Sequence, residues 1–163
     1  MQDSSGETVP LRFSVIVPTY QRRNLVLALV RSMMRQEFDG DFEVIVVVDG
    51  SNDGSSDALR KLGRIEVPFP LTILEQPNQG AAFARNRGAA VARGEILLFL
   101  DDDMEAHPQL LVEHDRSHRE GADVVLGHIP LHPESPSNIL SAAVKSWAED
   151  RACLLYTSPS PRD

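Results

Sequence analysis

The chain has 163 residues, 42% of them hydrophobic and 25% charged, a composition that excludes a disordered protein and fits one globular domain. The formal net charge is −8 and only Lys61 and Lys145 are lysines, which argues against a nucleic-acid-binding protein. No apolar run approaches the roughly 20 residues of a membrane-spanning helix, and the polar N-terminus is not a signal peptide. We therefore expect a cytoplasmic protein, with any membrane attachment made through a region beyond this chain.

The first half of the chain predicts two strands, each followed by a helix. The apolar, β-branched run 13–20 predicts a buried strand, and 42–50 predicts a second one. Apolar residues spaced three and four apart predict a helix within 24–38. The capping residues at 53–57 predict a short helix after them, with Gly63 as a plausible stop.

The second half continues the alternation of strands and helices. Asn78 and Gln79 are expected to cap a helix of small residues, and Pro108 suits the first turn of the next helix. In order, we predict a strand at 71–76, a helix at 79–94, a strand at 95–101, a helix at 107–121, a fifth strand at 122–129, a loop at 130–138 and a helix at 139–151.

Strands that are apolar almost throughout and separated by helices predict an α/β fold, a mostly parallel sheet with helices on both faces. Right-handed crossovers place every carboxyl end of such a sheet at one edge, where open α/β sheets bind ligands. Polar residues follow three of the predicted strands, namely Pro18-Thr19-Tyr20, Asp49, and the run 101–103. We expect them to converge in space.

Three consecutive carboxylates, Asp101, Asp102 and Asp103, follow the fourth predicted strand. Like charges at this spacing repel one another, and no basic residue stands beside them in the sequence. A hard divalent cation, Mg²⁺ or Mn²⁺, would relieve the repulsion by binding carboxylate oxygens and the phosphates of a substrate. The alternative is a solvated acidic turn that merely ends a strand.

Other candidate residues allow two interpretations each. Asp49 could accept a hydrogen bond from a base or ribose, or only precede a turn. Arg85 and Arg87 could reach an anion, or be surface arginines of a well-packed helix. His114 and His118 are spaced for a shared metal on one helix face, but such pairs more often form a wet face. The sequence contains neither a P-loop nor a dinucleotide-binding glycine motif.

Taken together, these stretches resemble the inverting glycosyltransferase family 2, of the GT-A fold. The matching stretches are SVIVPTYQR, FEVIVVVDGSNDGS, NQGAAFARNRGAAVARGEILLFLDDDM and HPQLLVEH, which cover most of 14–126. The resemblance implies a nucleotide-sugar donor, most often a UDP-sugar, a hydroxyl acceptor on a saccharide, lipid or other molecule, and Mn²⁺ or Mg²⁺ as cofactor. By position it implies donor-binding residues at Pro18, Thr19, Tyr20, Asp49 (to the base), Arg85, Asp101 and Asp102 (to the ribose), and a metal ligand at Asp103.

The family's reaction is a direct displacement in which a metal stabilises the departing diphosphate and a general base deprotonates the acceptor. The family's base is a carboxylate well after the Asp-x-Asp motif, often in a Glu-Asp pair. Glu149 and Asp150 are such a pair, but they come too early in the chain. We therefore expect the base beyond this chain, which would be the donor-binding half. A non-catalytic nucleotide-sugar-binding module and a metal-dependent nucleotidyltransferase are the alternatives.

Four segments are expected from these patterns. They are a flexible N-terminus at 1–11, a nucleotide-sugar-binding domain at 12–130, a loop and helix at 131–152 that begin the acceptor half, and a tail at 153–163. The tail, CLLYTSPSPRD, resembles a translated sequencing adapter, and the alternative is a natural disordered tail. It contains the only cysteine, Cys153, so no internal disulfide is expected.

Overall fold

The computed structural model describes residues 11–65 and 67–129. The chain divides into two compact units, Met1–Arg116 and Ser117–Asp163, and the sheet and the helices that cover its two faces belong to the first. The predicted loop 130–138, the helix 139–151 with its Glu149-Asp150 pair, and the tail 153–163 lie outside the described residues. Within the described ranges no helix has both the length and the apolar character needed to cross a membrane.

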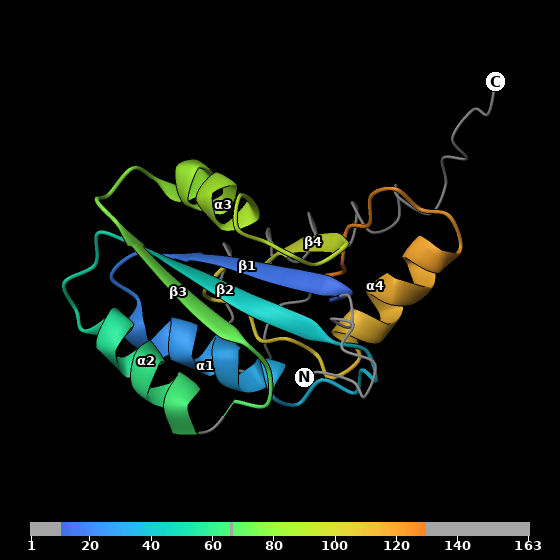
Figure 1. The fold of residues 1–163 in the computed structure, drawn as a ribbon, viewed down its shortest axis with the longest axis horizontal. Coiled ribbons are helices and arrows are strands. Elements are labelled where there is room, and N and C mark those ends of the chain that lie inside the picture. The colour runs from blue at the N-terminus through green and yellow to red at the C-terminus, as the bar shows by residue number, and fades with distance from the viewer. Residues whose placement is uncertain (1–10, 66, 130–163) are drawn as a thin grey trace, which may run out of the picture. The chain divides into compact units, whose positions relative to one another are not determined.

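A four-stranded parallel sheet forms the centre of the fold, in the order β3-β2-β1-β4 (Figure 1). Its strands are β1 (Phe13–Thr19), β2 (Phe42–Asp49), β3 (Leu71–Gln76) and β4 (Ile96–Phe99). The helices are α1 (Arg23–Met33), α2 (Ser55–Ile65), α3 (Ala81–Ala89) and α4 (Leu110–Arg119). The alternating parallel α/β architecture and the first four predicted strands are thus confirmed.

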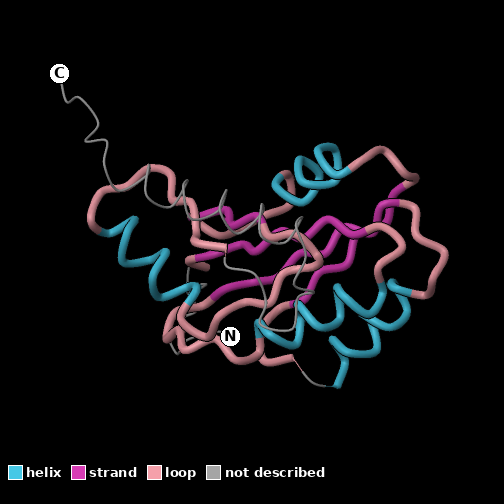
Figure 2. Tube along the Cα trace, turned by 180° about the vertical axis from the view of Figure 1, so that it is seen from behind, coloured by secondary structure: helices cyan, strands magenta, loops and turns pink. Residues whose placement is uncertain are grey.

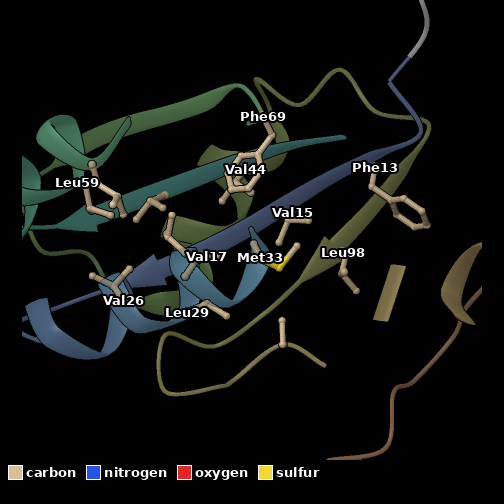
Figure 3. Packing of buried hydrophobic residues seen from close by; sticks show 14 of the residues in the cluster. Phe13, Val15, Val17, Val26, Leu29, Met33, Val44, Leu59, Phe69 and Leu98 are labelled. Atoms are coloured by element: carbon tan, nitrogen blue, oxygen red, sulfur yellow. The ribbon is translucent and has the colours of Figure 1, made fainter. Parts of the chain in front are cut away.

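Two faces of the sheet carry different layers of helices, as both views show (Figures 1 and 2). Alternate residues of a strand point to opposite faces, so Val15 and Val17 share one face while Ile16 lies on the other. The first face packs on α1 and α2, where Val26, Leu29 and Leu59 are fully buried (Figure 3). This layer holds the larger of the two hydrophobic clusters.

Helix α3 covers the opposite face over β1 and β2. A Cβ atom at Gly88 would lie 2.5 Å from Cγ2 of Ile16, so the small residues of α3 let it approach the sheet closely. Ala84 is fully buried against Ile45 and Val47 in the same layer. The helix of small residues is therefore explained by packing distance.

Some predicted helix ends were wrong. Helix α4 begins at Leu110, so Pro108 precedes it and does not lie in its first turn. Helix α3 ends at Ala89, although the sequence suggested Gly94. A Cβ at Gly94 would lie 2.4 Å from the backbone nitrogen of Ser14, so the chain must leave the helix early to bring this glycine against β1. Helix α2 continues past Gly63 to Ile65, because a glycine inside a helix costs only about 1 kcal/mol.

The predicted fifth strand, 122–129, is also wrong: this described segment forms no ladder. Val124 is 88% exposed and Leu126 58% exposed. A strand exists only where a neighbouring strand satisfies its backbone groups, and the described residues supply no such neighbour here. An apolar run alone does not carry that information.

A buried carboxylate fixes the sheet at its amino end. Glu43 is 1% exposed and accepts hydrogen bonds from the hydroxyl of Ser14 at 2.8 Å and from the guanidinium of Arg93 at 2.6 Å. Burial alone would raise the pKa of Glu43, but these hydrogen bonds outweigh it and the net pKa is lowered. The pair ties the segment after α3 to β1 and β2, at the edge opposite the predicted site.

Candidate functional site

The strand order changes direction at β1, since β2 follows on one side of it and β4 on the other. Open α/β sheets bind ligands beyond the carboxyl ends of their strands at such a switch point. The β1–β4 ladder stops at the pair Ile16 and Phe99, so the chain after β4 is free to diverge from β1. The predicted aspartate run lies in this segment after β4.

Asp102 connects this run to the end of β1. Its side chain is 7% exposed, and its Oδ2 accepts a 2.7 Å hydrogen bond from the hydroxyl of Thr19. Its Oδ1 accepts a second bond, 3.0 Å long, from the guanidinium of Arg22. Both carboxylate oxygens of Asp102 are thus held by residues at the carboxyl end of β1 and the start of α1.

The structure places basic residues beside the aspartates, although none stands next to them in the sequence. The same guanidinium nitrogen of Arg22 that reaches Asp102 also lies 3.1 Å from Oδ2 of Asp103. The hydrogen bond to Asp102, together with the charges of Asp102 and Asp103, raises the pKa of Arg22. Arg85, in α3, forms an ion pair with Asp101. Each aspartate of the run therefore has an arginine partner that is distant in the sequence.

The loop that carries Arg22 is braced by the loop after β2. Gln21 has a φ of 55°, a left-handed conformation that costs a non-glycine residue about 1–3 kcal/mol. Its backbone N–H donates to the Ser51 hydroxyl at 2.9 Å and its side-chain amide to Asn52 at 2.7 Å. The backbone N–H of Arg23 donates to Asp53 at 2.8 Å. These contacts compensate for the strain and fix the backbone on both sides of Arg22.

Asp49, at the end of β2, holds the entrance to α3. It is 3% exposed and accepts hydrogen bonds, each 2.8 Å long, from the side chain of Gln76 and the backbone N–H groups of Gln79 and Gly80. Burial would raise the pKa of Asp49, but these three donors outweigh it and lower the pKa. The predicted cap by Asn78 and Gln79 side chains is wrong: the helix has no side-chain N-cap bond of its own.

The other predicted residues are placed as follows. Pro18 is buried within β1, and Tyr20 is 49% exposed directly after it. Arg87 donates to the backbone carbonyl of Glu75 at 2.8 Å, which gives it a structural contact. No bond links Asp49 to the aspartate run itself, and the two parts of the edge are joined through the braced loop of Gln21.

The histidine pair of α4 offers no metal centre in the described residues. His114 is 5% exposed, and the ring Nδ1 of His118 lies 2.7 Å from the carbonyl oxygen of Ala122. Among the described residues no group of three or more histidine, cysteine, aspartate or glutamate side chains is placed to hold a metal. A hollow of about 370 Å³ lies beside α2, but its lining residues are Asp57, Arg60, Lys61, Arg64 and Ile65, none of them a predicted site residue.

The aspartate run nevertheless fits a divalent cation that is completed by phosphates. Mg²⁺ is usually held by one or two carboxylates plus substrate phosphate oxygens, so a preformed set of three protein ligands is not required. Asp103 has a 50% exposed side chain, and within the part of the chain that the structure describes only its Oδ2 is bonded, by Arg22 at 3.1 Å. Asp102 is buried, and each of its carboxylate oxygens already accepts one hydrogen bond. Asp103 is therefore the carboxylate best placed to accept a cation.

Arg22, Gln21, Gln76 and the Ser51–Asn52 turn were missed by sequence reasoning as parts of this edge. Arg22 comes three residues after the end of β1, close behind the predicted site residues Thr19 and Tyr20. Two signals in the sequence could have identified Arg22 as a site residue: its position shortly after a strand, and its charge, which is opposite to that of the aspartates.

Comparison with known proteins gives the relatives of this chain. A family model described as Glycosyl transferase family 2 matches residues 14–151. The chain is 36% identical over 117 residues to YfnE, an uncharacterised glycosyltransferase of Bacillus subtilis (strain 168), covering 71% of this chain and 29% of that protein. It is 31% identical over 123 residues to a Campylobacter jejuni GalNAc(5)-diNAcBac-PP-undecaprenol beta-1,3-glucosyltransferase, covering 76% of this chain and 40% of that protein.

Solved structures agree with these matches. S. aureus TarS 1-349 in complex with UDP superposes with a TM-score of 0.61 at 31% identity, covering 68% of this chain and 32% of that chain. Mannosyltransferase PcManGT from Pyrobaculum calidifontis, in complex with GDP-Man and Mn²⁺, gives a TM-score of 0.58 at 32% identity, covering 61% and 30%. This confirms the expected GT-A fold, and the chain spans less than half the length of each of these four proteins. The chain belongs to glycosyl transferase family 2.

Proposed function

We propose that this chain is the donor-binding half of an enzyme that transfers a sugar from a nucleotide diphosphate, first of all UDP, to an acceptor hydroxyl with inversion, assisted by Mn²⁺ or Mg²⁺. The observation that carries the proposal is the 2.7 Å hydrogen bond between Thr19 and Asp102, which sets the aspartate run against β1 at the switch point of the sheet. The UDP, UDP-GlcNAc and GDP-Man complexes of the structural neighbours support this class of donor.

Each residue at the edge has a proposed role. Asp103 binds the cation, while Asp102, whose oxygens Thr19 and Arg22 hold, faces the ribose and keeps its neighbour in position. Asp101 is supported by its ion pair with Arg85. Pro18 and Tyr20 line the nucleotide pocket beside them.

Asp49 is proposed to serve the nucleotide base in two ways. Its hydrogen bonds to Gln79 and Gly80 fix the loop in front of α3, which forms one side of the pocket. Among the described residues only Gly80 donates to its Oδ2, so this oxygen retains a lone pair for a donor on the base. Because Asp49 is almost completely buried, its main role is to fix the loop before α3, and its contact with the base is secondary.

The bound cation supplies Lewis-acid stabilisation of the diphosphate as it departs. The chain contributes orientation: the paired ends of β1 and β2, and the side-chain bonds to the aspartate run after β4, hold the donor-binding side chains before any ligand arrives. This reduces the entropy cost of reaching the reactive geometry. We place the general base that deprotonates the acceptor outside the described residues, where Asp150 remains a weaker candidate.

Calorimetric titration of UDP into the chain tests the proposal. With Mn²⁺ present we expect a one-to-one complex, and with EDTA we expect no measurable heat. Asp103→Asn should abolish the difference between the two conditions, whereas Asp57→Asn, which removes the same charge from an exposed position on α2, should preserve it. Equal binding of UDP in EDTA would overturn the metal assignment, and absence of binding for both UDP and GDP would overturn the donor-binding role.

A further inference from the structure

Arg22 contacts two aspartates whose surroundings differ, and this asymmetry points to a function. We propose that Arg22 is a resident counter-ion of the aspartate run, which competes with the divalent cation for Asp103 and contacts the donor diphosphate once the cation is bound. The inference rests on the proposed function, because it assumes that Asp103 and a diphosphate share the cation. It adds a role in binding the cation and the diphosphate for an arginine that the sequence did not single out.

The contact with Asp102 is the one that persists. Asp102 is 7% exposed, its other oxygen is held by Thr19, and its distance to the guanidinium is 3.0 Å. A buried carboxylate that lost this partner would keep an uncompensated part of its charge away from water. We therefore infer that the guanidinium keeps its contact with Asp102 while its other contacts change.

The contact with Asp103 is the one that can be exchanged. Both side chains are about half exposed, 51% for Arg22 and 50% for Asp103, and their 3.1 Å contact is open to water. An exposed pair of this kind contributes little, because water and salt screen it. A divalent cation attracts the same carboxylate with twice the charge, so it displaces the guanidinium of Arg22 from Asp103.

Arg22 keeps its positive charge through the exchange. A guanidinium stays protonated in proteins, so the side chain does not leave by losing a proton. A guanidinium and a divalent cation beside one carboxylate repel each other until an anion lies between them. A diphosphate is such an anion, and the planar fork of arginine suits its oxygens. Arg22 should therefore oppose binding of the cation alone and favour binding of the cation with the nucleotide.

The backbone at Arg22 is fixed, so the exchange involves only the side chain. Arg22 is the N-cap of α1, and its carbonyl accepts the N–H of Val26 at 3.0 Å. On the other side, the strained Gln21 is held by Ser51 and Asn52. A fixed backbone with a half-exposed guanidinium lets the side chain exchange Asp103 for the diphosphate without any movement of the main chain.

Two calorimetric titrations on the whole chain test the inference, one of Mn²⁺ alone and one of UDP at saturating Mn²⁺. Arg22→Ala should bind Mn²⁺ alone about fivefold more tightly, since it removes a competing charge. The same variant should bind UDP about tenfold more weakly, since it removes a charged contact to phosphate. A purely structural role would weaken both. Arg22→Lys keeps the charge and should leave the Mn²⁺ affinity unchanged.

Arg23→Ala is the matched control, because it removes the same charge from the next residue, whose recorded hydrogen bond comes from its backbone N–H. It should change neither constant by more than about twofold. Arg22→Gln repeats the neutral variant with a side chain that can still bond Asp102, and its fold is checked by thermal unfolding, so that it decides the case if Arg22→Ala does not fold.

The two proposals fail in different ways. Weaker or unchanged binding of Mn²⁺ alone by both neutral Arg22 variants would overturn the counter-ion role, and so would unchanged affinity for UDP. The absence of Mn²⁺ binding in the wild type and in both neutral variants would overturn it as well. Wild-type chain that binds Mn²⁺ but neither UDP nor GDP would instead overturn the donor-binding function.

Discussion

The hydroxyl of Thr19 donates a 2.7 Å hydrogen bond to the buried carboxylate of Asp102, a residue 83 positions later in the chain. The bond joins the end of β1 to the segment after β4 at the place where the two strands separate. It therefore does two things at once. It stabilises the turn that carries Asp102 and Asp103, and it keeps Asp103 at the edge of the sheet where β1 ends.

Thr19→Val should destabilise the chain, because valine has the shape of threonine but leaves Oδ2 of Asp102 without its donor. Thr19 is 2% exposed, so water cannot replace the hydroxyl easily. We expect a loss of about 1–2 kcal/mol in the free energy of unfolding. Urea denaturation measures this, with Thr19→Ser as the control that keeps the hydroxyl. Equal stability of the valine and serine variants would show that the bond contributes nothing.

Asp49→Asn should separate the two proposed roles of this residue. An amide group would set an N–H donor against one of the donors from Gln76, Gln79 or Gly80, at a cost of about 1–3 kcal/mol. We also expect weaker UDP binding, because the loop before α3 loses its anchor. Denaturation and calorimetry on the same preparation measure both effects. A variant with full stability would contradict the anchoring role.

The stability of the chain should fall in acid partly because of Glu43. Burial acts to raise its pKa, but the hydrogen bonds from Arg93 and Ser14 outweigh burial, so its folded pKa lies below the ordinary 4.5. A carboxylate with a lowered folded pKa adds stability above the unfolded pKa, and this stability disappears as pH falls through the folded value. Asp49 follows the same direction from 3.8.

Glu43→Gln should thus lower the free energy of unfolding at pH 7 by about 1–3 kcal/mol and make its decline below about pH 5 shallower. Denaturant midpoints at a series of pH values give the curve. Because Glu43 lies near the start of β2, at the opposite edge from the aspartate run, UDP affinity should stay within about twofold of the wild type. A loss of UDP binding in a folded variant would contradict the separation of the two edges.

Gly94→Ala should be strongly destabilising, by more than about 2 kcal/mol, because its Cβ would meet backbone atoms of Phe13 and Ser14 at 2.5 and 2.4 Å. Gly63→Ala is the contrasting substitution. Its Cβ would lie 3.2 Å from a flexible methyl group of Leu71, and alanine favours the helix interior by about 1 kcal/mol. In thermal unfolding the melting temperature should fall for Gly94→Ala and rise for Gly63→Ala, and a fall of equal size in both would contradict the difference between the two sites.

The four strands of the sheet could be predicted from the sequence because each strand is marked by its own run of residues. Apolar β-branched runs such as 42–50 identify buried parallel strands without any knowledge of their partners. The convergence of Thr19 and Asp102 also followed, since parallel strands share one carboxyl edge. The separate roles of Asp101, Asp102 and Asp103 came from the family resemblance and remain predictions.

What the sequence could not give depends on contacts between distant residues. Arg22 meets Asp102 across 80 positions, so nothing beside the aspartates revealed their counter-ion. The early end of α3 depends on how closely Gly94 approaches β1. The false fifth strand at 122–129 has the composition of a strand, yet the described residues offer it no neighbouring strand.

Paramagnetic broadening of backbone amide signals by Mn²⁺ locates the cation most directly. In the presence of UDP, substoichiometric Mn²⁺ should first broaden the signals of residues 19–22 and 101–104. It should spare those of Glu43 and Arg93, which lie at the other end of strands about 20 Å long. Asp103→Asn should remove the effect. Broadening centred on any other part of the chain, or unchanged broadening in Asp103→Asn, would contradict a metal-diphosphate site at the aspartate run.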